Sequence, residues 1–319
     1  MSSKTALIFG CSGQDGSLLS KLLLEKGFKV VGLSRKQKIQ DDNLKRLGIS
    51  DEIERLEGDI LDNDLVRSLL EKYYPDEVYN LAAQSSVGKS FELPRETLNG
   101  IITGTVNLLE SAKSLSFSGS IFFAGSGEIF GLTKEKAKIF TPQKPLSPYA
   151  VAKQTSFNLV RMYRDAYQLN CVTGVLFNHE SEFRNENFVT HKIINAAIEC
   201  SKDQTKKITL GNINIQRDWG WAEEYVEAMQ LINSSRAKQD FVICTGKLTK
   251  LEKIIDLAFK KFDLSWQDHI EIDKNLFRKQ EIEKSFGDPE HLKSTLNWEA
   301  KLTIEDIIEL LINKKIKSY

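Results

Sequence analysis

The chain has 319 residues, of which 41% are hydrophobic and 28% are charged, and this suits one large or two medium globular units. Its 44 basic and 44 acidic side chains give zero formal net charge, which excludes the extended basic face of a nucleic-acid-binding protein. The longest apolar runs are too short to span a membrane, and the polar first residues differ from a signal peptide. We therefore expect a cytoplasmic protein with no nucleic-acid and no membrane partner.

The cysteines and histidines predict neither disulfides nor a metal site. The four cysteines are widely separated and include no CxxC pair, so buried free thiols are favoured over disulfides. The four histidines do not form an HExxH or similar set, and we predict no metal. The residues concerned are Cys11, Cys171, Cys200 and Cys244, and His179, His191, His269 and His291.

The first predicted element is a buried parallel strand at 5–9, which ends in a glycine turn with the spacing GxxGxxG. Leucines at helical spacing follow the turn. A strand, a glycine turn and a helix N-terminus in this order form a pyrophosphate cradle, because backbone N–H groups and the helix dipole face the anion. A purely structural turn is the less favoured alternative. We predict cofactor contacts from Gly10, Gly13, Gln14, Asp15 and Gly16.

The second predicted strand, at 28–33, ends without the acidic residue that would bind a ribose 2′-hydroxyl. Arg35 and Lys36 stand there instead, and they predict NADP rather than NAD, with two solvated surface charges as the alternative. A third strand near 53–56 leads to Asp59, which is placed to reach an adenine amino group. The predicted cofactor contacts of this region are Arg35, Asp59 and Ile60.

Strands and helices continue to alternate up to residue 177, which predicts an α/β fold with a Rossmann-type doubly wound parallel sheet. Ligands bind at the carboxyl ends of such strands, where we expect Leu81, Ala82 and Ala83 to contact the cofactor. The predicted elements are helix 62–74, strand 77–81, helix 95–114, strand 119–124, helix 148–167 and strand 170–177.

Beyond residue 178 the pattern changes to helices with short strands, which predicts a smaller α/β substrate-binding domain. We predict an NADP-binding domain at 1–178, with 217–245 returning to it, and a substrate domain at 179–216 and 246–319. The predicted elements are helix 188–202, strand 207–210, helix 220–235, strand 240–244, helix 248–262 and helix 303–314.

Tyr149 and Lys153 form a candidate proton-transfer pair. Ser147 is a good helix N-cap and Pro148 suits the first turn, so the pair lies on one face early in a helix. An ammonium beside a phenol favours the phenolate, so we expect Lys153 to lower the pKa of Tyr149 from its ordinary value of about 10. The pair alone is a weak signal, because about one YxxxK is expected by chance.

Longer ordered strings run through nearly the whole chain, and together they resemble the GDP-mannose 4,6-dehydratase family of extended short-chain dehydrogenase/reductases. Strings of this length are much more specific than a single triplet. They are Gly13-Gln-Asp-Gly16-Ser17, Asn80-Leu-Ala-Ala83, Ser147-Pro-Tyr-Ala-Val-Ala-Lys153, Leu176-Phe-Asn-His-Glu-Ser181, Phe188-Val-Thr190, Leu210-Gly-Asn212, Arg217-Asp-Trp-Gly220, and Phe277-Arg278 with Glu281.

The resemblance implies a redox-neutral dehydration of a GDP-sugar with NADP. Tyr149 would take the proton from O4 while hydride leaves C4, with Ser126 hydrogen-bonded to that oxygen and Lys153 holding the phenolate and the nicotinamide ribose. Glu128 would then take the acidified C5 proton and help to expel the C6 hydroxyl as water, before hydride returns to C6. GDP-mannose would thus become GDP-4-keto-6-deoxymannose.

For the substrate, the resemblance implies contacts mostly from the second half of the chain. Val189 and Leu210 would pack on guanine, and Glu281 would accept from ribose hydroxyls. Two Arg side chains would face the diphosphate, which suits bidentate recognition, although each alone is more often a surface ion pair. The implied substrate contacts are Ser85, Asn178, Val189, Lys192, Leu210, Gly211, Arg217, Arg278 and Glu281.

The chain departs from the family pattern at positions that flank the sugar. Gly127 stands where the family usually has a hydroxylated residue, Ser86 where it usually has His, and Phe130 where Tyr is common. The resemblance also implies a homo-oligomer, either a homodimer through the helices at 95–114 and 148–167 or a homotetramer.

Three alternatives stay open on the sequence. The chain could be a 4,6-dehydratase of another GDP sugar such as GDP-manno-heptose, an NDP-sugar 4-epimerase or 4-keto reductase, or a non-catalytic nucleotide-binding regulator. Ser126, Tyr149 and Lys153 disfavour the regulator, because a binding module needs no proton relay. Glu128 favours a dehydratase over an epimerase, because removal of the C5 proton needs a second base.

Overall fold

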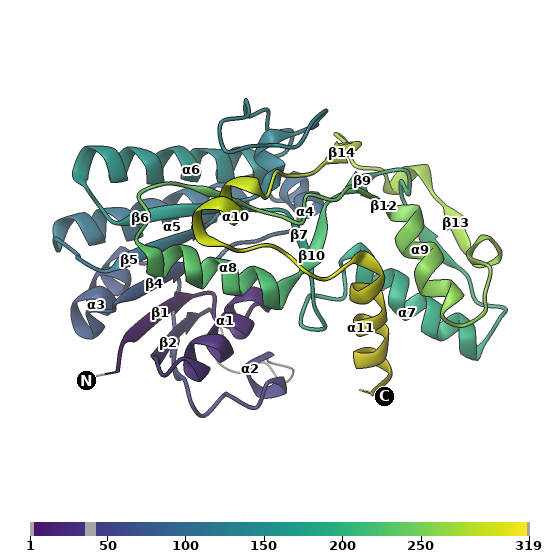
Figure 1. Ribbon diagram of the computed structural model, residues 1–319, viewed down its shortest axis with the longest axis horizontal. Helices are drawn as coiled ribbons and strands as arrows, with labels where there is room; N and C mark the ends of the chain where they lie inside the picture. Colours follow the sequence, from purple (N-terminus) through teal and green to yellow (C-terminus); the bar gives the residue numbers. More distant parts are fainter. Residues whose placement is uncertain (1–2, 36–42, 318–319) are drawn as a thin grey trace.

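The computed structural model describes residues 3–35 and 43–317 and is built on a seven-stranded parallel sheet (Figure 1). The strand order is β11-β6-β5-β4-β1-β2-β3, so the winding direction reverses between β1 and β4. The predicted α/β doubly wound fold is therefore confirmed, and its ligand-binding switch point lies at the carboxyl ends of β1 and β4. The strands are β1 Thr5–Phe9, β2 Lys29–Ser34, β3 Glu54–Glu57, β4 Glu77–Asn80, β5 Ser120–Ala124, β6 Cys171–Leu176 and β11 Phe241–Ile243.

Helices cover both faces of this sheet, and each layer has its own apolar core. On one face α3 (Asn63–Tyr73), α5 (Pro94–Ser114) and α6 (Pro148–Tyr167) pack through leucines and valines. On the other face α1 (Gln14–Glu25) and α8 (Ala222–Ser235) pack against each other and the sheet. Apolar side chains on both faces of every central strand explain why these strands are continuous apolar runs in the sequence.

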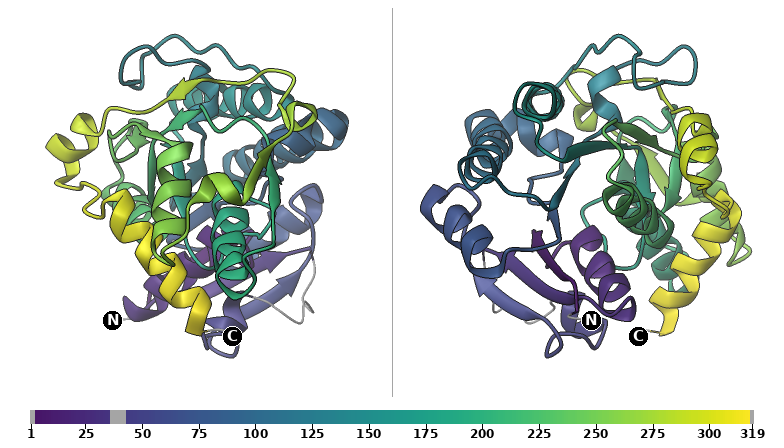
Figure 2. Two further views of the ribbon diagram at one scale, coloured as in Figure 1. Left: turned by 90° about the vertical axis from the view of Figure 1, so that its right-hand side faces the viewer. Right: turned by 60° about the vertical axis from the view of Figure 1, so that its left-hand side comes forward.

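A second group of helices lies beside the sheet and is seen from the front in the left view of Figure 2. Here α7 (Val189–Lys202), α9 (Leu251–Lys260) and α11 (Ile304–Lys317) enclose a separate core rich in isoleucine. The parallel pair β8 (Ile208–Leu210) and β13 (Ile270–Ile272) completes this group. The amphipathic pattern of the three helices follows from this shared core.

Short sheets stand between the two cores. β7 (Asn178–Glu180) pairs in parallel with β10 (Trp219–Trp221), and β9 lies between β12 and β14. The remaining elements are β9 Gln216–Arg217, β12 Thr249–Lys250, β14 Lys284–Ser285, α2 Asn43–Arg46, α4 Val87–Glu92, α10 Glu290–Leu296, η1 Gly127–Phe130, η2 Trp266–Asp268 and η3 Lys274–Leu276.

The predicted helix at 148–167 coincides with α6, because Ser147 and Pro148 form a strong start signal and Ser147 accepts from the Ala150 amide. The helices predicted to start at 220 and 248 begin later, at Ala222 and Leu251, because short strands precede them. The sequence did not reveal α4 and α10, which are too short for a periodic pattern. Lys36 of the predicted NADP signal lies outside the described residues.

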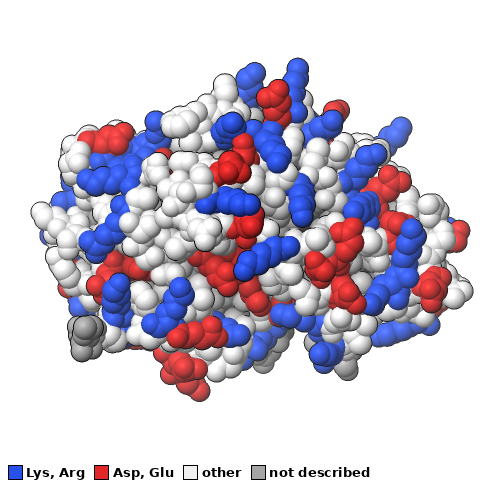
Figure 3. Space-filling view, in the orientation of Figure 1, with Lys and Arg blue, Asp and Glu red and all other residues white. Residues whose placement is uncertain are grey.

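The predicted free thiols are confirmed, because all four cysteines are buried and unbridged. Among residues 3–35 and 43–317, no helix is long and apolar enough to cross a membrane. On the face drawn in Figure 3, Lys and Arg side chains lie among Asp and Glu side chains, as the zero net charge implies.

Candidate active site

The glycine turn forms a tight cradle at the switch point. Gly10 has a φ of +90°, and a Cβ at this position would lie 2.9 Å from the Ala82 amide nitrogen. A Cβ at Gly16 would lie 2.2 Å from the Gly10 carbonyl oxygen, so only glycine allows α1 to start so close to β1. The α1 N-cap, Gly13, makes no side-chain capping bond. The first-turn N–H groups therefore suit an anion such as a dinucleotide diphosphate.

The other predicted cofactor residues surround this cradle. Arg35 is exposed directly after β2, and Leu81, Ala82 and Ala83 are half-buried directly after β4. The Asp59 carboxylate accepts from the Leu61 amide at 3.1 Å and so caps its own turn. Ile60 is buried against α5, where a Cβ at Gly104 would touch it.

Tyr149 and Ser126 meet at the carboxyl end of β5. Tyr149 lies in the first turn of α6 and is 8% exposed, and its hydroxyl is hydrogen-bonded to Ser126. Ser126 precedes η1 and its hydroxyl accepts from the Glu128 amide at 3.3 Å. One short turn therefore holds the hydroxyl and the carboxylate that follow β5.

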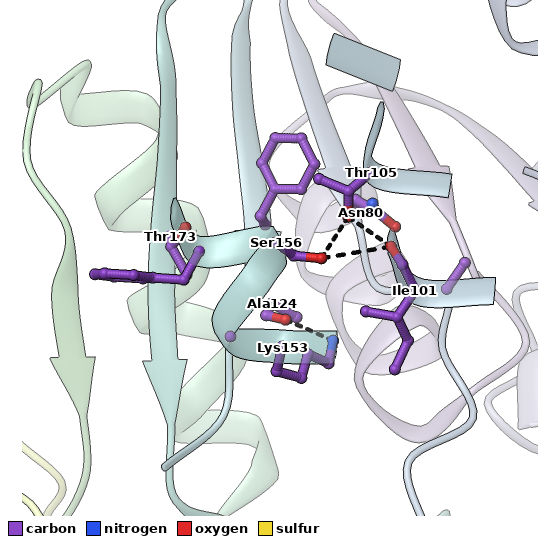
Figure 4. A pocket seen from close by; sticks show the side chains of 11 residues that line it. Asn80, Ile101, Thr105, Ala124, Lys153, Ser156 and Thr173 are labelled. Atoms are coloured by element: carbon purple, nitrogen blue, oxygen red, sulfur yellow. Dashed lines mark hydrogen bonds between the residues drawn. The ribbon is translucent and has the colours of Figure 1, made fainter. Parts of the chain in front are cut away.

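Lys153 reaches the same strand end from the next turn of α6 (Figure 4). Its Nζ donates to the Ala124 carbonyl at 2.7 Å and lies 5.8 Å from the centre of the Tyr149 ring. The ammonium is thus bonded to backbone, and its distance from the phenol ring leaves their attraction weaker than a direct contact would. Burial lowers the pKa of Lys153 to about 8.

The expectation that Lys153 lowers the pKa of Tyr149 is wrong. Burial raises the pKa of Tyr149 to about 12, although its hydrogen bond with Ser126 acts in the opposite direction. The Glu128 charge raises this pKa further. Desolvation of the phenolate outweighs the effect of a cation held by a backbone carbonyl, so the phenol is protonated near neutral pH.

A small pocket extends from Lys153 between α5, α6 and the sheet, and Figure 4 shows its lining. Thr105 and Ser156 share a hydrogen bond of 3.0 Å there. Two further polar atoms of the lining, Asn80 Oδ1 and Thr173 Oγ1, are buried without a partner among the described residues. Polar atoms of this kind suit an ordered water.

Glu128 is close enough to both Tyr149 and the predicted diphosphate-binding side chains for its charge to act on them. It is half-buried in η1, and its charge acts on Tyr149, Arg217 and Glu281. Arg217 is 3% exposed and its Nη2 lies 3.4 Å from Glu281 Oε1, while burial lowers the pKa of Arg217 and raises that of Glu281. Arg278 Nη1 lies 4.0 Å from the same oxygen.

The remaining predicted substrate residues differ from one another in how far their side chains are exposed. Asn178 opens β7 and is half-buried, whereas Leu210 is 5% exposed and belongs to the isoleucine-rich core. A Cβ at Gly211 would lie 2.9 Å from the Leu276 carbonyl oxygen, so glycine allows these two segments to touch. Val189 is half-buried at the start of α7, and Ser85 and Lys192 are exposed.

Three polar residues of this region had no role assigned from the sequence. His179 pairs with Asp15, and Arg184 donates to the His179 carbonyl oxygen and the Glu180 carboxylate. Asp218 accepts from the Thr245 and Gly246 amides and joins β9 and β10 to the end of β11. His179 and Asp218 directly follow predicted substrate residues along the chain, which was the available signal.

A doubly wound sheet with a glycine cradle at its switch point and a Ser-Tyr-Lys set beside it defines an extended short-chain dehydrogenase/reductase. Comparison with known proteins identifies the family within this class. The family model described as GDP-mannose 4,6 dehydratase matches residues 7–311, and the chain belongs to this family. The family predicted from the ordered strings is thus confirmed.

Three relatives illustrate the similarity. GDP-mannose 4,6 dehydratase 1 of Arabidopsis thaliana is 38% identical over 98% of this chain and 90% of its own. GDP-mannose 4,6 dehydratase of Homo sapiens is 32% identical over 98% and 91%. The crystal structure of dTDP-glucose 4,6-dehydratase from Bacillus anthracis in complex with NAD has a TM-score of 0.86 and 19% identity over 99% and 97%, which is a likeness of fold.

Proposed function

We propose that this protein converts GDP-mannose to GDP-4-keto-6-deoxymannose and water. The observation that carries the proposal is that Glu128 lies in the turn after Ser126, at 3.3 Å from its amide to the Ser126 hydroxyl, and that its charge acts on both Tyr149 and Arg217. A base near both an alcohol-oxidising pair and a diphosphate-binding Arg can reach a carbon next to the oxidised one. That arrangement serves elimination, whereas an epimerase or a 4-keto reductase does not need it.

Different residues of the chain carry out the separate proton transfers. Tyr149 first loses its own proton to solvent and, as a phenolate, takes the proton from O4, and Ser126, hydrogen-bonded to Tyr149, holds the same oxygen. Glu128 removes the C5 proton and helps the C6 hydroxyl to leave as water. Lys153 is an ammonium below about pH 8 and lies 5.8 Å from the centre of the Tyr149 ring. Arg217 and Arg278 hold the diphosphate, and Glu281 turns to the ribose hydroxyls.

A bound nicotinamide dinucleotide would supply the hydride acceptor and donor that this reaction needs. The cradle of Gly10, Gly13 and Gly16 suits its diphosphate, since a Cβ at two of these positions would fill the turn. We assign NADP rather than NAD because Arg35 is exposed at the end of β2. Residues 1–178 and 217–245 would form the cofactor domain, and residues 179–216 and 246–319 the nucleotide-sugar-binding domain.

The direct test is incubation of the protein with GDP-mannose and catalytic NADP⁺ in D₂O, followed by proton NMR. The expected result is a new C6 methyl signal, deuterium at C5 and no net NADPH. Unchanged GDP-mannose would contradict the proposal. A new hexose without a C6 methyl group would favour the 4-epimerase, and a parallel incubation with GDP-manno-heptose tests the other GDP sugar.

The cofactor preference has its own test. Arg35→Ala should weaken NADP⁺ binding about tenfold and leave NAD⁺ binding unchanged, because one charge-assisted contact to the 2′-phosphate is lost. Arg67→Ala, an exposed Arg paired with Glu71 on α3, is the control. Equal losses for both dinucleotides in Arg35→Ala would contradict the assignment of NADP.

We propose a homodimer through the outer faces of α5 and α6. Large apolar side chains are exposed at 40–48% on α6, namely Val151, Met162 and Tyr167, and at Leu93, the residue before α5. Light scattering of the purified protein measures the assembly, and Met162→Glu should shift a dimer toward monomer. A monomer in the unchanged protein would contradict this interface.

A further inference from the structure

His179 makes two hydrogen-bonding contacts, one through each ring nitrogen. Its Nδ1 lies 2.7 Å from the Phe177 carbonyl oxygen, and its Nε2 lies 3.0 Å from both carboxylate oxygens of Asp15. The residue is 8% exposed, and its ring stacks on Tyr225 with 4.6 Å between centroids. The ring therefore has little room to turn away from either oxygen.

These contacts determine where the protons lie. A carbonyl oxygen only accepts, and a carboxylate only accepts, so both His179 nitrogens must donate. A neutral ring would leave one nitrogen without a proton against an acceptor, unless Asp15 carried that proton. Burial alone disfavours both charges, but the mutual attraction of the pair raises the pKa of His179 and lowers the pKa of Asp15. The pair is an imidazolium and a carboxylate.

Of the surrounding groups, Gln14 and Arg184 favour the Asp15 carboxylate, whereas the Arg184 charge lowers the pKa of His179 and so opposes the imidazolium. Gln14 donates to Asp15 Oδ1 at 2.9 Å and accepts from the Ser181 hydroxyl at 2.9 Å. Arg184 lies near both members of the pair and is itself paired with Glu180 at 3.1 Å, so the cluster is neutral as a whole. Tyr225 faces the ring of His179 from α8.

The location gives the pair its importance. Asp15 lies in the first turn of α1, at the cradle proposed for the cofactor diphosphate, and its negative charge also raises the pKa of Tyr149. An unpaired carboxylate at this point would repel the diphosphate and oppose ionisation of the phenol. A net negative charge there would disfavour both the binding of the cofactor diphosphate and the ionisation of Tyr149.

We propose that His179 is a positioning residue that stays protonated as an imidazolium. Its charge neutralises Asp15, so that this carboxylate can support the glycine turn without repelling an anionic cofactor or opposing the ionisation of Tyr149. The inference rests on the proposed function for the identity of the cofactor, but the charge state of the pair does not. Through Gln14 and Ser181 the same pair joins the start of α1 to the segment that follows β7. Asn178 is the first residue of β7.

The charge state is measured by NMR of the whole protein labelled with ¹⁵N-histidine, with His179→Gln to assign the signal. We expect both ring nitrogens of His179 to carry protons at pH 7, above the ordinary imidazole pKa of about 6.5. A neutral ring at pH 7 would overturn the proposal. This result decides the pair even if the protein binds no dinucleotide, an outcome that would count against the proposed function alone.

Binding tests what the imidazolium does. His179→Gln leaves the Asp15 charge unbalanced and should raise the NADP⁺ dissociation constant about tenfold, by the coupling expected for close charges. Adding Asp15→Asn removes that charge, and the double variant should bind within about threefold of the original protein. His269→Gln, at a buried His bonded to the Lys206 carbonyl, should bind as the original does.

A purely structural role predicts the opposite order. If His179 only packs, the double variant loses two sets of contacts and binds no better than His179→Gln, which would overturn the proposal. The pH profile of turnover gives a second reading. In His179→Gln the rise of activity with pH should move to higher pH, and in the double variant it should return.

Discussion

The two sides of the candidate active site differ in how they are held. On the proton-transfer side, Ser126, Tyr149 and Lys153 are 7–8% exposed and bonded to one another or to backbone. On the substrate side, the connection between β13 and β14 carries Arg278 with 38% of its side chain exposed, near Leu276 at 55%. Among the described residues, Glu281 is the only member of this connection that forms an ion pair within 4 Å with the buried Arg217.

This difference follows from the tasks of the two sides. Proton transfer needs donor and acceptor within hydrogen-bond reach and shielded from water, so its groups are placed by a helix N-terminus and a strand end. A nucleotide sugar must enter and leave, so the residues that cover it belong to a connection with few buried contacts. The shielded side is costly to the fold, since Lys153 is charged and buried, whereas the exposed side contributes little to stability.

Of the substitutions that test this difference between the two sides, Tyr149→Phe should have the largest effect. We expect kcat to fall about 10²–10⁴-fold, the usual contribution of a positioned acid or base, with folding retained. Turnover of GDP-mannose followed by NMR measures it. Tyr167→Phe, on the exposed end of the same helix, is the matched control and should keep kcat. A loss below tenfold in Tyr149→Phe would contradict its role.

Glu128→Gln separates oxidation from elimination. The amide cannot take the C5 proton, so we expect exchange of that proton with solvent to stop and kcat to fall about 10²-fold or more. Deuterium uptake at C5 of the recovered sugar is the measurement. Glu135→Gln replaces an exposed carboxylate on the next loop and should leave exchange intact. Continued exchange in Glu128→Gln would assign the proton to another base.

Lys153→Met tests the cost of burial. Below about pH 8 the wild-type ammonium is charged when folded and unfolded, so replacing it should stabilise the fold by on the order of 1–3 kcal/mol while activity is lost. Between about pH 8 and 10.5 the folded lysine deprotonates first, so wild-type stability rises with pH and the gain shrinks. Denaturant unfolding at pH 7 and pH 10 measures this, and an equal gain at both values would contradict it.

Gly127→Ala probes how tightly the catalytic turn is packed. A Cβ there would lie 2.8 Å from the Phe177 ring, so we expect a loss of about 1–3 kcal/mol in the free energy of unfolding. Gly100→Ala, where a Cβ meets nothing within 4 Å in α5, should instead stabilise by about 0.5–1 kcal/mol. The same crowding explains why no larger side chain stands at 127. Equal effects of the two substitutions would contradict this packing.

Arg278→Ala should have the smallest effect, because its side chain is partly exposed and lies 4.0 Å from Glu281. We expect KM for GDP-mannose to rise about two- to tenfold with kcat nearly unchanged, as for loss of uniform binding. Lys279→Ala, the exposed neighbour, should leave KM unchanged. A fall in kcat that exceeds the rise in KM would place Arg278 among the catalytic groups.

Much of the fold and site can be predicted from local sequence. Within the glycine turn, Gly10 is required by its φ of +90° and Gly16 by its close approach to the Gly10 carbonyl oxygen, and both requirements are local. Ser147 and Pro148 start a helix by themselves, and this puts Tyr149 and Lys153 one turn apart. Strings of this kind also identify the family, since each repeats a local requirement in order along the chain.

Only the tertiary structure decided the electrostatics. Whether Lys153 lowers the pKa of Tyr149 depends on burial and on the Ala124 carbonyl, neither of which the spacing of two residues contains. Asp15 and His179 are 164 residues apart and become an ion pair because β1 and β6 end at the same edge of the sheet. Local propensity acts within a few residues, whereas desolvation and charge pairing depend on what the folded chain brings together.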